Sequence, residues 1–327
     1  MDNRRNLYWT TQSNLTLRMN INTIGIHDSV ADIFPPERLV DKIVRGDVTA
    51  SVVDDDSLFD CDAVVTLAYT DEFLAADVGW IHSIQSGIDR FPLSDLFKND
   101  IVLTNSIGIH RDCVSDACVG YVVGLARGLD VFIHNQTDRH WERPAWDQTF
   151  TVAGETACVV GLGTLGCGIA ERLNTLGMHV TGVRRQPDPV DHVDQVFTSS
   201  ELPKAIAEAR FVVLAVPLTE ATTQLVDADL LASMANDSFL VNVSRGGVVD
   251  QTALIEAIQT GDIAGAALDV FETEPLPKDS PLWDLERVIV TPHSAGLYRE
   301  YHSDVANIVR ENLDRIRDGD PLLNCVQ

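Results

Sequence analysis

A glycine-rich hexapeptide in the middle of the chain constrains the fold more than any other feature. The run Gly161-Leu162-Gly163-Thr164-Leu165-Gly166 follows an apolar segment, residues 157–160, and opens a helical pattern, residues 165–176. In a strand-turn-helix of this kind the three glycines allow a tight turn, a close backbone approach and close packing of the helix on the strand. The helix N-terminus then presents free N–H groups to a pyrophosphate. The run therefore predicts a βαβ unit that binds a dinucleotide.

Short apolar segments alternate with helical patterns along the chain. Because nearly continuous apolar strands are typical of a parallel sheet with helices on both faces, the pattern predicts an α/β protein with doubly wound sheets. A length of 327 residues fits two such domains. The polar tract of residues 135–148 is predicted to be an arm or loop. Candidate strands cover residues 21–26, 63–67, 80–84, 101–104, 157–160, 179–183, 211–216, 240–243, 265–270 and 288–290, and candidate helices cover 112–129, 165–176, 202–208, 254–258 and 305–318.

The charge balance excludes several classes of partner. Lys and Arg together number 24 and Asp and Glu 49, so the net charge is −25. Such a surface repels nucleic acids and anionic membranes, and it must carry local positive charge if it is to capture an anionic substrate. The composition fits a mildly acidic enzyme, and it fits better an adaptation to high salt, where ions screen the self-repulsion.

Signals for secretion or membrane insertion are not recognised in the sequence. It has no run of 18 apolar residues and no secretion signal, so we expect a cytoplasmic protein. The polar N-terminal segment leaves open whether Met1 or Met19 begins the natural chain. The six cysteines form no C-x-x-C pair and no histidine cluster has zinc-ligand spacing, so we expect reduced thiols and no metal.

The residues after the second strand of the nucleotide-binding unit indicate which dinucleotide binds. A carboxylate there would accept a hydrogen bond from the ribose 2′-hydroxyl of NAD(H). This chain instead has Arg184 and Arg185, and no carboxylate occurs before Asp188. Guanidinium groups bind a 2′-phosphate and cannot accept from a hydroxyl, so NADP(H) is the preferred cofactor. The alternative is that both arginines are ordinary surface residues and that NAD(H) binds.

Three further segments place reactive side chains directly after apolar strands, where an open parallel sheet binds its ligands. Arg245 lies in NVSRG (242–246), Glu274 in DVFETEPLP (269–277) and His293 in TPHSAG (291–296). Histidine can give a proton to a carbonyl oxygen near pH 7, arginine can hold a carboxylate, and glutamate can orient a histidine and favour its charged form. Each residue alone is more often solvated or structural, but together they predict hydride transfer to a small 2-oxo acid.

With these motifs the sequence resembles the D-isomer-specific 2-hydroxyacid dehydrogenase family. The resemblance is close from about residue 80 to residue 326 and looser before, and the patterns N-x-x-R-G, D-V-F-x-x-E-P-L-P and T-P-H-x-A-G are highly specific. It implies reversible reduction of a 2-oxo acid to the D-2-hydroxy acid by hydride transfer from a nicotinamide cofactor, which Arg184 and Arg185 predict to be NADPH. The resemblance implies that Arg245 binds the substrate, that His293 is the general acid and base, and that Glu274 orients His293 and favours its charged form.

The resemblance also implies how the domains are arranged. A Rossmann-type dinucleotide-binding domain, residues 111–296, is inserted in a flavodoxin-like substrate domain, residues 1–110 and 297–327, and the reaction takes place in a cleft between them. Members commonly form homodimers through the cofactor domain. The stretch from Val131 to Trp146 is the expected dimerisation arm.

Other positions match the family by motif. The resemblance assigns the backbone N–H groups at Ser86 and Gly87 to the substrate carboxylate, and Asp269 to the nicotinamide carboxamide. Tyr69 and Tyr298 could line the pocket for the substrate side chain, although ordinary packing is an equally good interpretation of both. The remaining candidates for cofactor binding are Val216, Pro217, Thr222, Val243 and Ser244.

Several functions remain open. Glyoxylate/hydroxypyruvate reductase and phosphoglycerate dehydrogenase are alternatives within the family, and the small number of basic residues between positions 60 and 110 favours an uncharged aliphatic substrate side chain. Formate oxidation is less favoured, since relatives with that activity usually lack the glutamate at position 274. A dinucleotide-sensing, co-repressor-like binding protein could retain the same three residues and is the non-enzymatic alternative.

Overall fold

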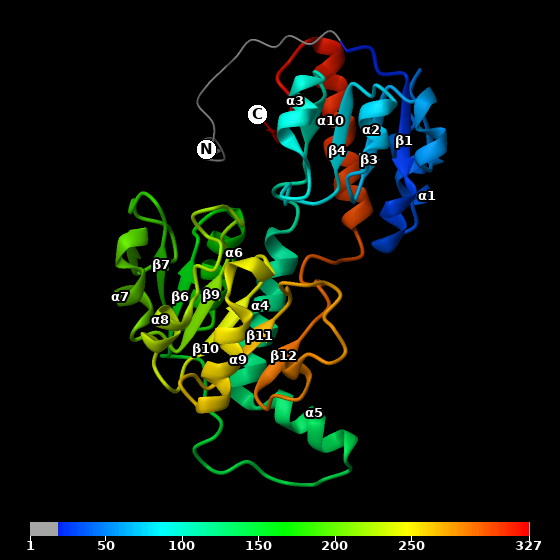
Figure 1. Ribbon diagram of the computed structural model, residues 1–327. Coiled ribbons are helices and arrows are strands. Elements are labelled where there is room, and N and C mark those ends of the chain that lie inside the picture. The colour runs from blue at the N-terminus through cyan, green and yellow to red at the C-terminus, as the bar shows by residue number, and fades with distance from the viewer. Residues whose placement is uncertain (1–18, 327) are drawn as a thin grey trace. The chain divides into compact units, whose positions relative to one another are not determined.

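The computed structural model describes residues 19–326, which form two compact units (Figure 1). The first unit takes in the described residues up to Ser106 and those from His302 onward, and the second unit is Ile107–Tyr301. The choice between Met1 and Met19 as the natural start involves residues outside the described range.

The first unit is built on a six-stranded sheet in the order β13-β5-β4-β3-β1-β2. All pairs are parallel except β13 with β5, which is antiparallel. Without its antiparallel edge strand this is the flavodoxin-like strand order. The strands are β1 (Thr23–His27), β2 (Thr49–Val53), β3 (Ala63–Thr66), β4 (Trp80–Ser83), β5 (Val102–Thr104) and β13 (Cys325–Val326), and the helices are α1 (Glu37–Ile43), α2 (Glu72–Ala75), α3 (Leu93–Lys98) and α10 (Tyr301–Asp318), with 3-10 turns at Asp28–Asp32 and Asp55–Asp60.

The second unit contains an all-parallel seven-stranded sheet in the order β12-β11-β10-β9-β6-β7-β8. The chain first runs outward from β6 to β8 and then returns to β9 on the other side of β6, so the topological switch point lies between β6 and β9. The strands are β6 (Thr156–Val160), β7 (His179–Val183), β8 (Gln195–Phe197), β9 (Phe211–Leu214), β10 (Phe239–Asn242), β11 (Gly265–Leu268) and β12 (Val288–Val290). The helices are α4 (Arg111–Arg127), α5 (Leu129–Thr137), α6 (Thr164–Thr175), α7 (Leu202–Ile206), α8 (Ala228–Ala232) and α9 (Gln251–Thr260), with 3-10 turns at Ser199–Glu201, Gly246–Val248 and Pro281–Trp283.

Local chemistry explains where several helices begin and end. The Asp250 carboxylate accepts a hydrogen bond from the Ala253 N–H at the start of α9, and Gly261 ends the same helix in the left-handed conformation. Asp227 caps α8 in the same manner. Gly128, with φ +66°, separates α4 from α5. These are the expected roles of a short acidic side chain at an N-cap and of glycine after a C-terminus.

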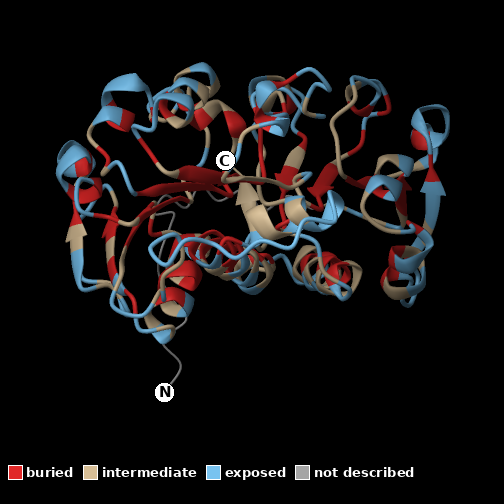
Figure 2. Cartoon of the chain, turned by 90° about the horizontal axis from the view of Figure 1, so that it is seen from below, coloured by how far each residue is buried: buried red, intermediate tan, exposed pale blue. Residues whose placement is uncertain are grey.

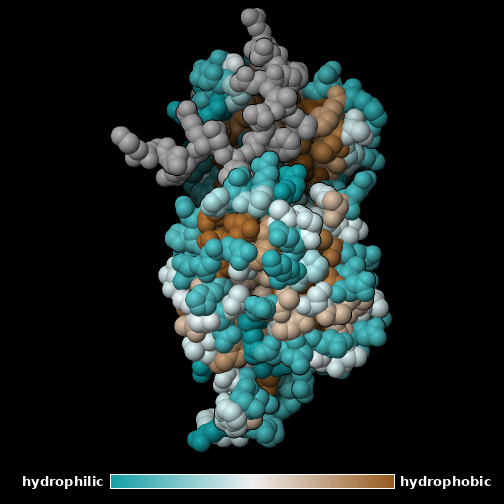
Figure 3. All heavy atoms as spheres, turned by 90° about the vertical axis from the view of Figure 1, so that its left-hand side faces the viewer, coloured by the Kyte–Doolittle hydropathy of each residue, from teal (hydrophilic) through white to brown (hydrophobic). Residues whose placement is uncertain are grey.

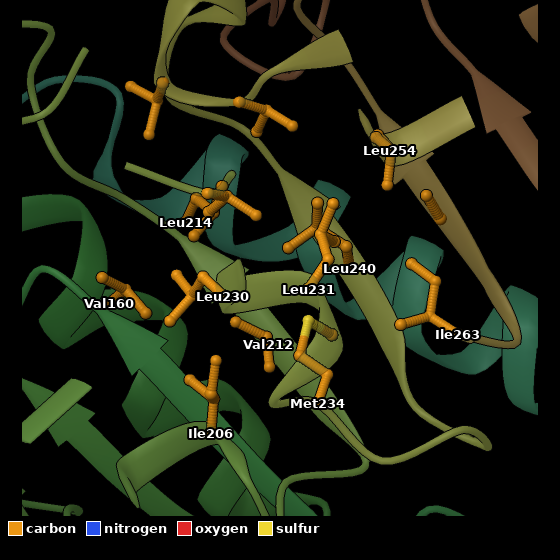
Figure 4. Close-up of a cluster of buried hydrophobic side chains, with 14 of the residues drawn as sticks. Val160, Ile206, Val212, Leu214, Leu230, Leu231, Met234, Leu240, Leu254 and Ile263 are labelled. Carbon is orange, nitrogen blue, oxygen red and sulfur yellow. The ribbon is translucent and has the colours of Figure 1, made fainter. Parts of the chain in front are cut away.

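Apolar side chains from the strands fill the core of each unit. Figure 2 shows buried residues gathered along the strands and on the inward sides of the helices, with exposed residues on the outward sides. In the second unit, Val160, Leu214 and Leu240 from three strands point toward Leu230 and Leu231 of α8 (Figure 4). Burying side chains of this size contributes about 1.5–3 kcal/mol each to folding.

Every predicted strand has a counterpart, whereas short elements at the sheet edges were not predicted. Strand β2 buries only Val53, and β8 has three residues, so neither carries an apolar run that local patterns detect. Helix α10 begins at Tyr301, earlier than the predicted position 305. The predicted arm is helical at its start, because α5 extends to Thr137.

The unit boundaries also differ from those expected from the sequence. They fall after residue 106 and after residue 301, instead of after residues 110 and 296. The physical reason is that the ring of His110 packs against Tyr301 at 4.7 Å, so both residues belong to the second unit. The ring of His302 packs against Phe34 in the first unit.

Within residues 19–326, no single helix is long and apolar enough to span a membrane. Helices α4 and α5 are long and apolar enough only when they are counted together, and the chain bends by 74° between them. Helix α4 is packed in the core of the second unit, where it contacts α6. The six cysteines are free thiols.

Candidate active site

The glycine run forms a turn that leaves the start of α6 open. Gly161 has φ +99°, and a Cβ atom there would lie 2.6 Å from the Ala215 carbonyl oxygen. A Cβ atom at Gly166 would lie 1.8 Å from the Gly161 oxygen, so only glycine lets the helix pack on the strand. Gly163 is the N-cap, and within the described part of the chain no side chain caps α6 and open space surrounds the position of the Gly163 Cβ. The first N–H groups of α6 therefore fit a pyrophosphate.

The other residues of the run have different environments. Leu162 is buried and fills the space beside Gly182, where a Cβ atom would lie 2.7 Å from the leucine side chain. Thr164 is exposed and Leu165 half-buried. Leu162 therefore anchors the turn to the sheet.

Arg184 and Arg185 directly follow β7, beside the start of α6. Arg184 is half-buried and Arg185 exposed. Burial raises the pKa of the Cys167 thiol on α6, and the positive charge of Arg184 opposes that rise, which places this guanidinium near the helix start. Among residues 19–326, neither arginine side chain has a hydrogen-bond or ion-pair partner. The site therefore holds two positive charges that no carboxylate of the described chain neutralises.

The loop after β9 lies next to the glycine turn. Val160 pairs with Leu214, so the ends of β6 and β9 are adjacent at the switch point. The Thr222 hydroxyl donates to the Pro217 carbonyl at 2.6 Å and folds this loop. The branched side chain of Val216 lies 2.8 Å from the Cβ position of Gly161.

Asn242, at the end of β10, shapes the loop that carries Arg245. The Asn242 Oδ1 atom accepts from the N–H and the hydroxyl of Ser244 at 3.0 and 2.7 Å, and Nδ2 donates to the Arg245 carbonyl at 3.0 Å. The Arg245 guanidinium donates to the Ser244 carbonyl at 2.8 Å. Gly246 is required because a Cβ there would lie 1.8 Å from the Phe271 carbonyl carbon. The preceding candidate in this loop, Val243, is buried.

His293 and Glu274 form a direct pair at the ends of neighbouring strands. The His293 Nδ1 atom lies 2.9 Å from Oε2 of Glu274, with the side chains 30% and 23% exposed. The other Glu274 oxygen accepts from the Phe271 N–H at 3.1 Å. Because β10, β11 and β12 are adjacent and parallel, the loops bearing Arg245, Glu274 and His293 leave the same edge of the sheet.

Asp269 holds the His293 loop in an unusual conformation. His293 has φ +51°, a left-handed value that is rare for a residue other than glycine. The buried Asp269 carboxylate accepts from the Thr291 hydroxyl at 2.7 Å and from the N–H groups of Ser294 and Ala295 at 2.8 and 3.0 Å. Such strain persists where surrounding bonds over-determine the backbone.

Sequence reasoning missed one member of this network, Tyr121 of α4. Its hydroxyl lies 2.8 Å from the Thr291 hydroxyl and 3.4 Å from Asp269, across 148 positions of sequence. Burial raises the pKa of Tyr121 to about 12, so the hydroxyl stays protonated. No local pattern marks a tyrosine within an apolar helix as a partner of a distant loop.

The candidates in the first unit lie after β3 and β4. The Ser86 hydroxyl donates to the Ser106 carbonyl at 3.2 Å, and Gly87 follows in the same loop. Tyr69 is half-buried and packs against the apolar core of this unit, with edge contacts to Phe73 and Phe91 at 5.9 and 6.1 Å. Tyr298, in the second unit, stacks on Tyr301 at 5.5 Å.

Comparisons with known proteins agree on one family. Residues 119–295 match the family described as "D-isomer specific 2-hydroxyacid dehydrogenase, NAD binding domain". A glyoxylate reductase of Korarchaeum cryptofilum (strain OPF8) is 34% identical over 275 residues, which cover 80% of this chain and 81% of the relative. A glyoxylate/hydroxypyruvate reductase B of Yersinia pestis (strain Pestoides F) is 31% identical over 257 residues, with 77% and 78% covered.

A solved structure gives the same result at the level of the fold. The D-isomer-specific 2-hydroxyacid dehydrogenase of Xanthobacter autotrophicus Py2, crystallised with NADPH and MES, superimposes with a TM-score of 0.79 at 29% identity. The match covers 94% of this chain and 98% of that one. The chain therefore belongs to the D-isomer-specific 2-hydroxyacid dehydrogenase family and is an NAD(P)-dependent oxidoreductase that interconverts a 2-oxo acid and the D-2-hydroxy acid.

Proposed function

We propose that this protein is an NADPH-preferring reductase of small aliphatic 2-oxo acids of the glyoxylate type. The observation that carries the proposal is the 2.9 Å pair between His293 and Glu274, on a sheet edge that also bears Arg245 and the glycine turn. The relatives from Korarchaeum cryptofilum and Yersinia pestis are named for activity on glyoxylate, or on glyoxylate and hydroxypyruvate, which supports a short substrate.

His293 is the proposed proton donor. Nδ1 is directed at Glu274, so Nε2 is the ring nitrogen that can give a proton to the carbonyl oxygen during reduction and take it back during oxidation. Glu274 accepts the hydrogen bond at Nδ1 and so holds the ring in one orientation. When bound, the nicotinamide cofactor supplies the hydride that adds to the carbonyl carbon of the substrate.

Arg245 is the proposed anchor of the substrate carboxylate, which it can hold through two parallel hydrogen bonds. In the first unit, we propose that the backbone N–H groups at Ser86 and Gly87 are carboxylate-binding groups. In a chain with net charge −25, these groups give an anionic substrate a local positive site. Tyr69 and Tyr298 remain candidates for the wall around the substrate side chain.

The preference for NADPH rests on the two arginines after β7, whose side chains have no partner among residues 19–326. Their charges fit a 2′-phosphate, and the Xanthobacter autotrophicus relative was crystallised with NADPH. The glycine turn would hold the pyrophosphate, and the loop of Val216, Pro217 and Thr222 would flank it. Val243 and Ser244, which follow β10, are the remaining candidates for cofactor contacts. Asp269 Oδ2 accepts only from the Ala295 N–H within the described chain, so it keeps a lone pair for the carboxamide.

We also propose a cytoplasmic homodimer. Trp141 and Trp146 are 94% and 93% exposed and Ile133 is 64% exposed, all in the arm that follows α4. Large apolar side chains gathered on one protruding segment are typical of an interface, and a second copy of the chain is the proposed partner. Free thiols fit a reducing compartment.

The experiment that tests the proposal follows the absorbance of NADPH and NADH with a panel of 2-oxo acids, in high and low salt. The panel contains glyoxylate, hydroxypyruvate, pyruvate, longer aliphatic acids and phosphohydroxypyruvate. We expect oxidation of NADPH in preference to NADH, with the shortest acids as the best substrates. Folded protein that binds NADPH but oxidises it with none of these acids would contradict the proposal and favour a dinucleotide-binding regulator. Preference for the phosphorylated acid would contradict the substrate assignment alone.

A further inference from the structure

We propose that Asn105 is a positioning residue that aims the Gly87 N–H at the substrate carboxylate, and that the C-terminal strand β13 holds Asn105 in place. The inference rests on the proposed function, because it takes Gly87 as part of the carboxylate site. All the contacts that carry it lie within the first unit.

Asn105 lies at the end of β5 and bonds directly to the proposed carboxylate loop. Its Nδ2 atom donates to the Ser86 carbonyl at 2.9 Å, and the residue is only 2% exposed. Two further bonds join the same segments, from the Ser106 N–H to the Gln85 carbonyl at 3.0 Å and from the Ser86 hydroxyl to the Ser106 carbonyl at 3.2 Å. The loop is therefore tied to the residues that follow β5.

Peptide geometry converts the Asn105 bond into a direction for Gly87. The Ser86 carbonyl and the Gly87 N–H belong to one planar trans peptide, in which the C=O and N–H bonds point in opposite directions. Because the Asn105 amide fixes the carbonyl on one side, the N–H must point to the other side, away from Asn105. If the Asn105 amide is lost, this peptide can rotate, and the Gly87 N–H no longer points in the direction needed to donate to the substrate carboxylate.

Asn105 is itself held by the residue that precedes β13. The Asn105 N–H donates to the Asn324 carbonyl at 3.2 Å, and the Asn324 side-chain amide donates to the Asn105 carbonyl at 3.0 Å. Strand β13 continues this pairing, with Cys325 opposite Thr104. The two asparagines are 219 positions apart, so the sequence does not show this contact.

The C-terminal segment has its own anchor on α10. Asn312 is fully buried, its Oδ1 accepts from the Leu323 N–H at 2.7 Å, and its Nδ2 donates to the Leu323 carbonyl at 3.2 Å. The Arg315 guanidinium donates to the Pro321 carbonyl at 2.9 Å. A continuous set of hydrogen bonds therefore runs from α10 through Asn324 and Asn105 to Ser86.

The test compares Asn105→Ala and Asn324→Ala with the matched control Asn99→Ala. Asn99 lies in the same unit and also donates its side-chain amide to a backbone carbonyl, that of Asp95 at 2.8 Å, but it ends α3 away from the loop. For each full-length variant we would measure kcat and KM with glyoxylate, and the Kd of NADPH by nucleotide fluorescence. Thermal unfolding checks that each variant is folded.

We expect Asn105→Ala to raise the KM for glyoxylate by about tenfold, the effect of one misaligned hydrogen bond to a charged group, with the Kd of NADPH within about twofold of the wild type. Asn324→Ala should raise KM in the same direction by about threefold, since it removes one of the two bonds that hold Asn105. The control should leave both constants unchanged. A folded Asn105→Ala protein with wild-type KM, or a parallel rise of KM and of the NADPH Kd, would overturn the inference.

Asn105→Asp decides the question if Asn105→Ala fails to fold, because it keeps the size of the buried side chain but has no amide N–H to donate to the Ser86 carbonyl. A wild-type KM in folded Asn105→Asp overturns the role of Asn105, and a wild-type KM in Asn324→Ala overturns the role of β13. Failure of the proposed function is distinguishable, because it is seen in the wild type as the absence of glyoxylate-dependent NADPH oxidation.

Discussion

The imidazole Nδ1 of His293 and the carboxylate Oε2 of Glu274 lie 2.9 Å apart, although 19 positions separate the two residues in the chain. The pair forms because β11 and β12 are neighbours and both loops leave the same edge of the sheet. A backbone with φ +51° at His293 presents the ring toward the glutamate.

His293→Ala should lower kcat for 2-oxo acid reduction by roughly 10²–10⁴-fold, because the proton donor is lost. Glu274→Gln should give a smaller loss, since the ring keeps a hydrogen-bond partner but loses the negative charge behind it. Steady-state kinetics measure both, and NADPH fluorescence should show unchanged cofactor binding. His140→Gln, an exposed histidine of the same unit, is the control. Unchanged turnover in His293→Ala would falsify the assignment.

Arg184→Ala should lower kcat/KM for NADPH by roughly 10- to 100-fold while kcat/KM for NADH changes little, because only NADPH has a phosphate for this guanidinium to bind. The measurement is the ratio of the two constants in each variant. Arg127→Ala, which removes an exposed arginine at the end of α4, should leave the ratio as in the wild type. An equal loss of kcat/KM with both cofactors would contradict phosphate binding by Arg184 and indicate a structural role.

His82 should make the protein less stable in acid. Burial lowers the pKa of His82 to about 3 from an ordinary value of 6.5, so below pH 6.5 the unfolded chain binds a proton that the folded chain does not. The free energy of unfolding should therefore fall by about 1.4 kcal/mol per pH unit from this group as the pH drops from about 6.5 toward 3.

Urea unfolding of the wild type and of His82→Gln over this pH range measures that slope. The variant should lose the histidine contribution to the slope, whatever its stability at neutral pH, while His134→Gln, an exposed histidine, should keep it. Identical slopes in His82→Gln and the wild type would contradict the prediction.

Gly246→Ala should destabilise the Arg245 loop, because its Cβ would lie 1.8 Å from the Phe271 carbonyl carbon. We expect a loss of about 1–3 kcal/mol in the free energy of unfolding and a higher KM for the 2-oxo acid. Gly247→Ala is a closely matched control, since the nearest atom to its Cβ would be a leucine methyl at 3.3 Å. Equal effects of the two substitutions would show that backbone approach is not the reason for the glycine.

Salt should stabilise the protein. With a net charge of −25, self-repulsion opposes the compact state, and ions screen it. The face drawn in Figure 3 is mostly hydrophilic, with small groups of apolar residues. We expect the unfolding temperature to rise by roughly 5 °C between low salt and molar KCl. KCl and potassium sulfate should act alike at equal ionic strength if screening is the cause. Greatest stability at the lowest salt would refute the idea.

Local sequence determined the nucleotide turn, the arginines after β7 and the identity of the reactive side chains. These features could be predicted because each depends on neighbouring residues: a glycine turn, the end of an apolar strand and the first turn of a helix. Strands with continuous apolar runs were found for the same reason, whereas β2 and β13 carry too little apolar sequence to be recognised.

Only the tertiary structure decided which of these residues touch. The bond from Tyr121 to Thr291 spans 170 positions and the pair of Asn105 with Asn324 spans 219, and neither leaves a pattern in the sequence. Such contacts depend on the order of strands in the sheet and on the direction of each side chain, which follow from packing of the whole unit. The sequence by itself therefore identified the reactive side chains, whereas the packing of the strands determined which groups contact them and at what distance.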